Sequence, residues 1–246
     1  MTGSIASPGL RYIDVVGRLV ARLGTEEWPN IVAGARLVAD AIAAGRLVHV
    51  FGTGHSHMLA EELFYRAGGL VRVSPILFEG LMLHASAPLS TSLERLHGLA
   101  DALLLDHPVD AGDVLVIASN SGGNAVTSEL AQRVRAAGAS VIAVTSLRYA
   151  TSAKARQADL PRLHELADVV IDNGGAVGDA SVEIEGLDRR VAPTSTVVGA
   201  AILNAMVAEA VHLLVERGTV PDVYTSSNTE GGDEANAAYL RPGTPR

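Results

Sequence analysis

The chain contains no cysteine among its 246 residues. Disulfide frameworks, thiolate zinc sites and cysteine nucleophiles are therefore excluded, and stability must come from a buried core. An excess of basic residues is also missing, since 27 Asp and Glu stand against 19 Lys and Arg. This balance gives no electrostatic footprint for nucleic acid or for an anionic membrane. We expect neither as a partner, so an anionic ligand would be held by helix dipoles and neutral donors.

Long uninterrupted apolar runs are absent as well. The most apolar stretch, residues 196–215, is broken by Asn204, Glu209 and His212, which predicts a buried helix and not a membrane span. The first twenty residues show no basic segment followed by an apolar one, so we expect no signal peptide. With the lack of cysteine, this favours the cytoplasm. The 48% of apolar residues is enough for one large globular domain.

Apolar patterning predicts strands that alternate with helices. The predicted strands cover residues 47–51, 71–77, 113–118, 140–145 and 168–171. The predicted helices cover residues 10–23 and 31–44, a stretch from Ser56 through Arg66, residues 125–137 and residues 195–215. Nearly continuous apolar strands separated by helices indicate an α/β fold, a doubly wound five-stranded parallel sheet flanked by helices with an N-terminal helical extension.

Three parts of the chain are expected. They are N-terminal helices over residues 1–45, a sheet domain over residues 46–217 and a C-terminal extension over residues 218–246. The extension is rich in Pro, Gly, Ser and Asn, which is typical of a mobile tail. Its apolar residues, among them Tyr224 and Tyr239, favour instead a segment that packs on the domain or on a partner subunit.

Hydroxyl-rich loops follow two predicted strands and precede the last helix. Residues 52–56 are Gly-Thr-Gly-His-Ser, residues 119–124 are Ser-Asn-Ser-Gly-Gly-Asn, and residues 194–196 are Thr-Ser-Thr. Ligands of open parallel sheets bind beyond the carboxyl ends of the strands, and free N–H groups at helix starts attract anions. These loops therefore suit a phosphate monoester held without a cation. Taken singly, each loop can also be a packing turn or a capped helix start.

These residues resemble the sugar isomerase (SIS) domain of phosphosugar isomerases, binding domains and lyases. The resemblance rests on the three loops, above all on the Ser-x-Ser-Gly of residues 119–122, and spans residues 31–215. Residues 55–62 are similar to a bacterial subfamily of stand-alone SIS proteins. The resemblance implies the SIS fold and a bound sugar 6-phosphate, with no cofactor. The implied binding residues are Gly54, His55, Ser56, Ser119, Asn120, Ser121, Gly122, Asn124, Ser195 and Thr196. Asn124 stands where many members have threonine.

Chemistry at C2 of a sugar requires a base that removes a carbon-bound proton. Two candidates, Glu61 and Glu62, lie on the helix after the first loop. In the heptose-phosphate isomerases of the family, the second Glu of an Ala-Glu-Glu-Leu stretch is the base, which implies Glu62. Their His-x-x-x-Glu spacing implies Glu61 instead, paired with His57. Both carboxylates can also belong to a solvated helix face that pairs with Arg66.

Histidines are candidates for the catalytic acid. His55 and His57 can open a sugar ring or protonate a leaving hydroxyl. His84, beyond the second strand, either reaches the same cleft or caps a turn. His55, His57 and Glu61 can also bind a divalent metal, but the remaining ligands cannot be named, so no metal is expected.

The resemblance implies an enzyme that abstracts the C2 proton of an amino-sugar 6-phosphate. Isomerases of glucosamine 6-phosphate-type sugars commonly place a lysine near the nitrogen, whereas the only lysine here, Lys154, lies away from the motifs. Residues 202–206 look like those of the etherases in this superfamily, which eliminate at C3. These features favour a lyase that dehydrates an N-acetylhexosamine 6-phosphate. The alternatives are an aldose–ketose isomerase and a non-catalytic phosphosugar sensor.

Two further expectations concern assembly. Regulators with an SIS domain carry a helix-turn-helix domain before it, but here only about 45 residues precede the first strand and they show no basic recognition helix. This favours the enzyme over the sensor. SIS enzymes commonly build their sites between subunits, and the helix over residues 195–215 is too apolar to face water, so we expect a homodimer or homotetramer.

Overall fold

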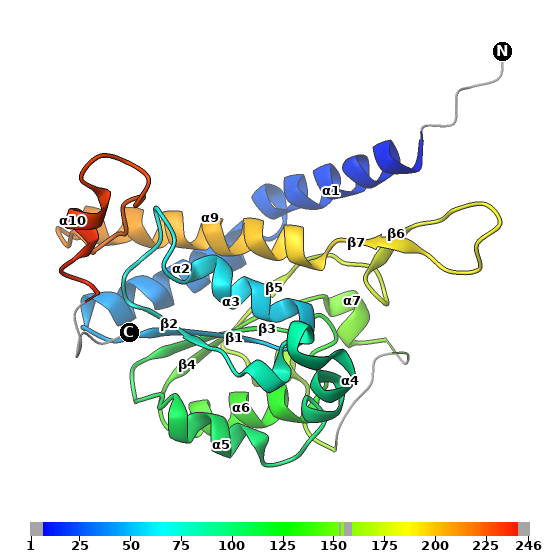
Figure 1. Cartoon of the computed structure of the whole chain (residues 1–246), viewed down its shortest axis with the longest axis horizontal. Helices are drawn as coiled ribbons and strands as arrows, with labels where there is room; N and C mark the ends of the chain where they lie inside the picture. The colour runs from blue at the N-terminus through cyan, green and yellow to red at the C-terminus, as the bar shows by residue number, and fades with distance from the viewer. Residues whose placement is uncertain (1–6, 153, 155–158, 241–246) are drawn as a thin grey trace.

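The computed structural model describes residues 7–152, 154 and 159–240, and its centre is a five-stranded parallel sheet (Figure 1). The strand order is β2-β1-β3-β4-β5. The strands are β1 (Val48–Gly52), β2 (Val73–Ile76), β3 (Val114–Ala118), β4 (Ser140–Thr145) and β5 (Val169–Asp172). The predicted doubly wound α/β fold is confirmed, and each observed strand end lies within two residues of the predicted one.

The chain changes direction at β1, which lies between β2 and β3. Val48 pairs with Val73 on one side and with Val114 on the other. From β1 the chain passes to β2 in one direction, and β3, β4 and β5 follow in the other. The crevice beyond the carboxyl ends of β1 and β3 is therefore the switch point, where open α/β sheets bind ligands. Gly52 pairs with Ala118 at this edge, so the loops that follow them are neighbours.

Helices cover both faces of the sheet. One face packs against α1 (Pro8–Thr25), α2 (Trp28–Ala43), α3 (His57–Leu63) and α9 (Ser195–Glu216). The other packs against α5 (Leu99–Asp106), α6 (Ala125–Ala136) and α8 (Leu163–Leu166). The short helices η1 (Gly54–Ser56), η2 (Glu79–Leu81), α4 (Leu83–Leu93) and α7 (Leu147–Ala150) complete this part of the fold. Successive strand residues face opposite layers, as Val50 and Phe51 do in β1.

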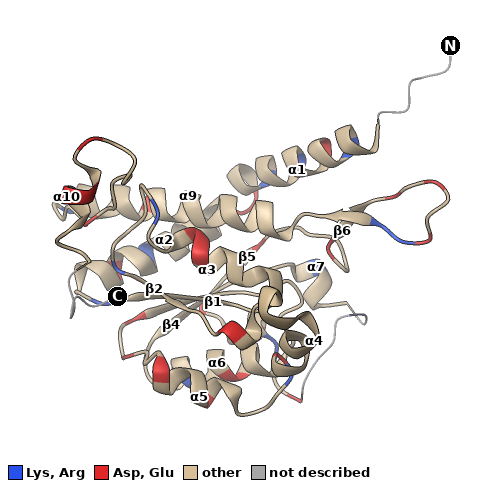
Figure 2. Ribbon diagram, in the orientation of Figure 1, with Lys and Arg blue, Asp and Glu red and all other residues tan. Residues whose placement is uncertain are grey.

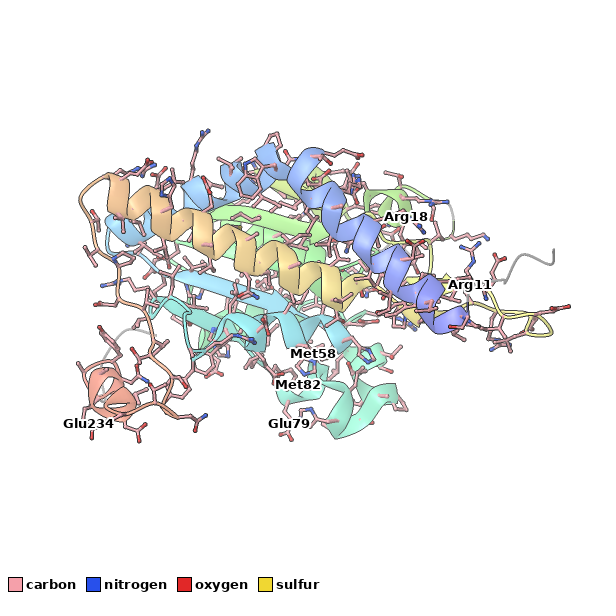
Figure 3. All side chains as sticks on the ribbon, turned by 90° about the horizontal axis from the view of Figure 1, so that it is seen from above. Arg11, Arg18, Met58, Glu79, Met82 and Glu234 are labelled. Atoms are coloured by element: carbon pink, nitrogen blue, oxygen red, sulfur yellow. The ribbon has the colours of Figure 1, made fainter. Side chains whose placement is uncertain are left out.

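Helix α9 is the long apolar helix that the sequence predicts. Val198, Ile202 and Met206 are buried in the core layer that α9 shares with α2 and α3. Within the described part of the chain it is the one helix that could cross a membrane by length and composition, and 44% of its most apolar window is buried in the fold. Figure 2 shows few charges along it. Seen from above, α1, which carries Arg11 and Arg18, lies beside the first half of α9 (Figure 3).

Helix α3 is shorter than predicted. It ends at Leu63 and not at Arg66, because Phe64 is extended, with φ −90° and ψ 131°, and Tyr65 has a φ of +45°. The next residues bond to the C-terminal extension, where the Gly68 N–H donates to the carbonyl of Tyr224 at 2.8 Å. This tertiary pairing overrides the local helical pattern.

The C-terminal extension packs on the fold up to residue 240. Val223 forms an antiparallel bridge with Leu70, and Tyr224 is 4% exposed. The helix α10 (Gly232–Asn236) places Asn236 so that its amide bonds both the N–H and the carbonyl of Thr225. Tyr224 and Asn236 thus connect this segment to the fold, while residues 241–246 lie outside the described residues.

An antiparallel hairpin between β5 and α9 has no counterpart in the prediction. Its strands are β6 (Ala180–Val182) and β7 (Val191–Pro193), with Ala180 paired to Pro193. Three-residue strands are too short to show an alternating apolar pattern. The hairpin leads directly into the first turn of α9 (Figure 1).

Candidate functional site

A narrow pocket opens at the switch point of the sheet. Its polar wall consists of Ser56, Ser119, Asn120, Asn173, Ser195 and Thr196. Its apolar wall consists of Leu59, Ala118 and Val144. The fold thus brings the three hydroxyl-rich loops together, although they are up to 140 residues apart along the chain. The pocket contains five of the residues that the sequence singles out, and Asn173 is an addition.

The first loop is shaped by a close approach of its own backbone. A Cβ on Gly52 would lie 2.3 Å from the carbonyl oxygen of Ser56, so only glycine fits there. Gly54 has a φ of +57°, which favours glycine for a different reason. The loop forms the turn η1 and continues into α3, which places Ser56 in the pocket wall. Thr53 points elsewhere, because its hydroxyl donates to Glu94 Oε2 at 2.9 Å.

The second loop presents Ser119 and Asn120 to the pocket. The N–H of Gly122, which has a φ of +62°, donates to Ser119 Oγ at 3.2 Å. Asn120 Oδ1 accepts from Asn173 Nδ2 at 2.9 Å. Within the described residues, the buried Asn120 Nδ2 has no hydrogen-bond partner. An unsatisfied buried donor is costly unless a ligand or water completes it, so it marks this loop as a place for an acceptor.

A buried cation stands behind the second loop. Arg162 is 9% exposed, and its Nη1 donates to the carbonyl of Ser121 at 3.3 Å. The pocket wall does not include three other predicted residues of this loop, Ser121, Gly122 and Asn124. The loop motif predicts a site without a cation, because Arg162 lies about forty residues beyond it in the sequence. Its charge makes the potential at the loop more positive.

The third loop begins α9, and an internal carboxylate already occupies its donors. The N–H groups of Thr194 and Ser195 donate to Asp179 Oδ1 at 3.1 and 2.9 Å. The Ser195 hydroxyl donates to Asp179 Oδ2. Asp179 comes from the hairpin that the sequence did not predict, so no motif pointed to it. In the part of the chain that the structure covers, the buried hydroxyl of Thr194 has no partner.

Three predicted acid–base residues form a separate group beside the pocket. His57 Nε2 lies 3.8 Å from Glu61 Oε2, and the rings of His57 and His84 are 6.2 Å apart. The His57 Nδ1 atom hydrogen-bonds with the carbonyl of Gly54, which fixes the ring against the first loop. His55 is exposed next to this group. Among residues 7–152, 154 and 159–240, no set of three His, Asp or Glu side chains is arranged to hold a metal ion.

Glu62 points away from this group toward α9. Its Oε1 accepts from Asn204 Nδ2 at 2.8 Å, and its Oε2 accepts from Arg66 Nη1 at 2.5 Å. Its side chain is 21% exposed, against 52% for Glu61. Leu59 in the pocket wall precedes it by three residues, about 4.5 Å of helix rise. Glu62 therefore lies about one turn from the pocket, with its carboxylate held at two points.

Comparisons with known proteins agree with this architecture. The SIS domain family matches residues 11–146. A UPF0309 protein from Listeria innocua is 42% identical over 229 residues, which cover 93% of each chain. Another from Halalkalibacterium halodurans is 46% identical over 229 residues, covering 93% of this chain and 92% of that one. The solved structure of a phosphoheptose isomerase from Francisella tularensis has a TM-score of 0.54 at 12% identity, covering 81% of this chain and 94% of that one. At that identity it shows a shared fold.

Proposed function

We propose that the chain, which belongs to the SIS domain family, binds a sugar phosphate in the switch-point pocket. There it acts on C2 of the sugar. The observation that carries the proposal is the convergence of hydroxyl and amide side chains from three helix starts on one pocket. Neutral donors and helix N-termini suit a phosphate dianion. The name of the Francisella neighbour, an isomerase of a phosphorylated heptose, supports the same class of ligand.

Glu62 is the proposed base. Asn204 and Arg66 hold its carboxylate about one helical turn from the pocket, so a sugar anchored by its phosphate can bring C2 within reach. Glu62 takes the C2 proton, and the loop donors hold the negative charge that develops on the C1 oxygen. His57 or Glu61 then donates a proton to the departing C3 hydroxyl, which leaves as water. Return of the proton at C1 instead gives the ketose when C2 carries a hydroxyl in place of the N-acetylamino group.

Dehydration of an N-acetylhexosamine 6-phosphate is the reaction that we propose. It is supported by the position of Lys154, the only lysine in the sequence. This lysine is exposed in a turn and is not part of the pocket wall. Aldose–ketose isomerisation is the second candidate, and the name of the Francisella isomerase favours it. Both reactions begin with the same proton abstraction, so the same residues serve either one.

Mass spectrometry of an incubation with N-acetylhexosamine 6-phosphates tests the reaction. We expect a product lighter by one water with the wild-type chain, and a rate that is lower by at least about 100-fold in Glu62→Gln, because the base is gone. The matched control is Glu26→Gln, because Glu26 also pairs with an arginine one helical turn away but is 65% exposed and lies outside the pocket wall. A ketose of unchanged mass, formed from a hexose 6-phosphate that carries a hydroxyl at C2, would support isomerisation. No change with any of these sugar phosphates would contradict both reactions.

Thermal unfolding with added sugar separates binding from chemistry. The Glu62→Gln variant should keep the stabilisation that the sugar phosphate gives to the wild-type chain, because the phosphate loops are intact. The unphosphorylated sugars are the matched ligands, and they should give no stabilisation. Equal stabilisation by phosphorylated and unphosphorylated sugars would mean that the pocket does not bind phosphate.

We also propose that the chain assembles as a homodimer or homotetramer through the outer faces of α1 and α9. Leu10 and Ile13 on α1 are 63% and 65% exposed, and Val197 and Val215 on α9 are 40% and 52% exposed. Exposed apolar residues on adjacent helices are typical of protein interfaces. Sedimentation equilibrium at micromolar concentration should show a dimer or tetramer. The double variant Leu10→Ser, Ile13→Ser should shift it toward monomer, and a monomeric wild-type chain would rule the assembly out.

A further inference from the structure

We propose that Asp179 is a built-in competitor for the ligand's phosphate. In the free chain its carboxylate takes the donors at the start of α9, and it turns away when a phosphate binds there. This inference rests on the proposed function, because it concerns how the switch-point pocket admits its anion. It makes Asp179 a determinant of affinity that lies outside every motif of the sequence.

The donors that Asp179 uses belong to the pocket. Ser195 lines the pocket together with Thr196, and its hydroxyl donates to Asp179 Oδ2. A serine hydroxyl has one hydrogen, so Ser195 cannot donate to Asp179 and to a phosphate oxygen together. The N–H of Ser195 is bonded to Asp179 Oδ1 at 2.9 Å as well. A phosphate can therefore use Ser195 as a donor only after the carboxylate has released it.

Charge acts in the same direction as hydrogen bonding. The first turn of a helix carries a partial positive charge that stabilises one nearby anion. Asp179 supplies that anion in the free chain. A phosphate dianion that contacts Ser195 would lie within a few ångströms of the carboxylate, where like charges repel. The helix start can stabilise either the Asp179 carboxylate or the phosphate. Competition from the carboxylate therefore weakens the binding of the phosphate.

The hairpin delivers Asp179 to this position. Ala180 of β6 pairs with Pro193 of β7. Asp179, just before β6, therefore lies opposite Thr194, just after β7. Asp179 has a φ of +69°, in a region that few residues other than glycine adopt and that aspartate tolerates. Its N–H donates to the carbonyl of Ala176 at 2.8 Å. These backbone contacts can remain while the side chain alone rotates, so release of the donors needs no movement of the hairpin.

Calorimetric titration of three proteins with inorganic phosphate and with N-acetylglucosamine 6-phosphate tests the proposal. In Asp179→Asn, the side-chain oxygen can still accept from the N–H groups of α9, while the negative charge is lost and Ser195 is freed. We expect the Kd of both ligands to fall about tenfold relative to wild type. Asp179→Gly removes the side chain and suits the positive φ, so it should show the same direction if the Asn variant folds poorly. The matched control is Asp188→Asn, which removes an exposed charge from the far part of the same hairpin and should leave Kd unchanged.

The outcomes separate this inference from the function on which it rests. Tighter binding in both Asp179 variants, and not in Asp188→Asn, supports the competitor. Equal or weaker binding in the Asp179 variants, beside measurable binding in wild type, means that Asp179 is a structural cap and overturns the inference alone. A complete lack of binding by all of the proteins overturns the proposed function and the inference together.

Discussion

Replacing Gly52 with alanine is expected to abolish sugar phosphate binding and to lower the melting temperature. The new Cβ would lie 2.3 Å from the carbonyl oxygen and 2.5 Å from the carbonyl carbon of Ser56. Both atoms are backbone, so no side-chain rotation relieves the overlap, and the turn between β1 and α3 must open. Overpacking of this kind costs about 3 kcal/mol. Ser56 moves with the turn, so the pocket loses one wall.

Gly54 provides the matched control, because it is the other glycine of the same loop. Its φ is +57°, but a Cβ there would meet only Leu83 Cδ2 at 3.9 Å. Gly54→Ala should therefore cost about 1–2 kcal/mol of left-handed backbone strain and keep phosphate binding. Thermal unfolding with and without N-acetylglucosamine 6-phosphate measures both quantities. If Gly54→Ala is more damaging than Gly52→Ala, the close approach to Ser56 is not the reason for glycine at position 52.

The five parallel strands could be predicted from the sequence because their signal is continuous. Strand β3, for example, is Val-Leu-Val-Ile-Ala and is buried along its whole length. A strand covered by helices on both faces needs apolar residues at every position. The hairpin strands β6 and β7 lack this signal, since each has three residues and Val191 is 39% exposed. For that reason the apolar pattern does not predict the hairpin that positions Asp179.

The end of α3 shows a second limit of sequence reasoning. Residues 64–67 contain neither glycine nor proline, so the local pattern continues the helix to Arg66. The break comes from pairing with a distant segment, in which Gly68 donates to Tyr224 and Tyr224 donates to Gly69. Glu62 and Arg66 still form their ion pair across the end of the helix. The pairing of the two side chains was predictable, whereas the backbone between them was not.

The pocket divides in the same way between local and distant contributions. Ser56 and Ser119 stand at helix starts that directly follow strands, so the motif and the topology together locate them. Asn173, Asp179 and Arg162 reach the same region from other segments, and their places depend on tertiary pairing. Asn173, for instance, is held at Asn120 by a side-chain hydrogen bond of 2.9 Å. Residues that come from single positions in loops carry no spacing that a sequence pattern can detect.

Asp113 should be a major determinant of stability, at the edge of the sheet opposite the pocket. It is 4% exposed and accepts three hydrogen bonds. The N–H of Leu47 donates to Oδ1 at 3.0 Å, the N–H of Asp110 donates to Oδ2 at 3.0 Å, and His49 Nε2 lies 3.2 Å from Oδ2. Asp113→Ala leaves these three donors without their acceptor, at a cost of about 3 kcal/mol or more.

The pH dependence of unfolding provides a second measure of this cluster. Burial lowers the pKa of His49 below its usual 6.5, and the hydrogen bond with Asp113 offsets this only in part. Burial acts to raise the pKa of Asp113, but the hydrogen bonds from Leu47, Asp110 and His49 outweigh it and the pKa lies below 3.8. In both cases the unfolded chain binds the proton more readily, so the stabilisation is complete above the unfolded pKa and is lost as the pH falls below it.

Chemical denaturation of Asp113→Ala should show the loss of stability at neutral pH, with the pocket and its ligand binding unaffected. Asp101→Ala is the matched control, because Asp101 also forms a close ion pair, with Arg133 at 2.7 Å, but on an exposed surface. It should leave the unfolding midpoint unchanged. The wild-type midpoint should fall as the pH drops below about 6.5, and this fall should be smaller in His49→Gln, which has no imidazole to protonate. Equal losses from Asp113→Ala and Asp101→Ala would contradict the buried cluster, because only Asp113 is buried with donors that have no other acceptor.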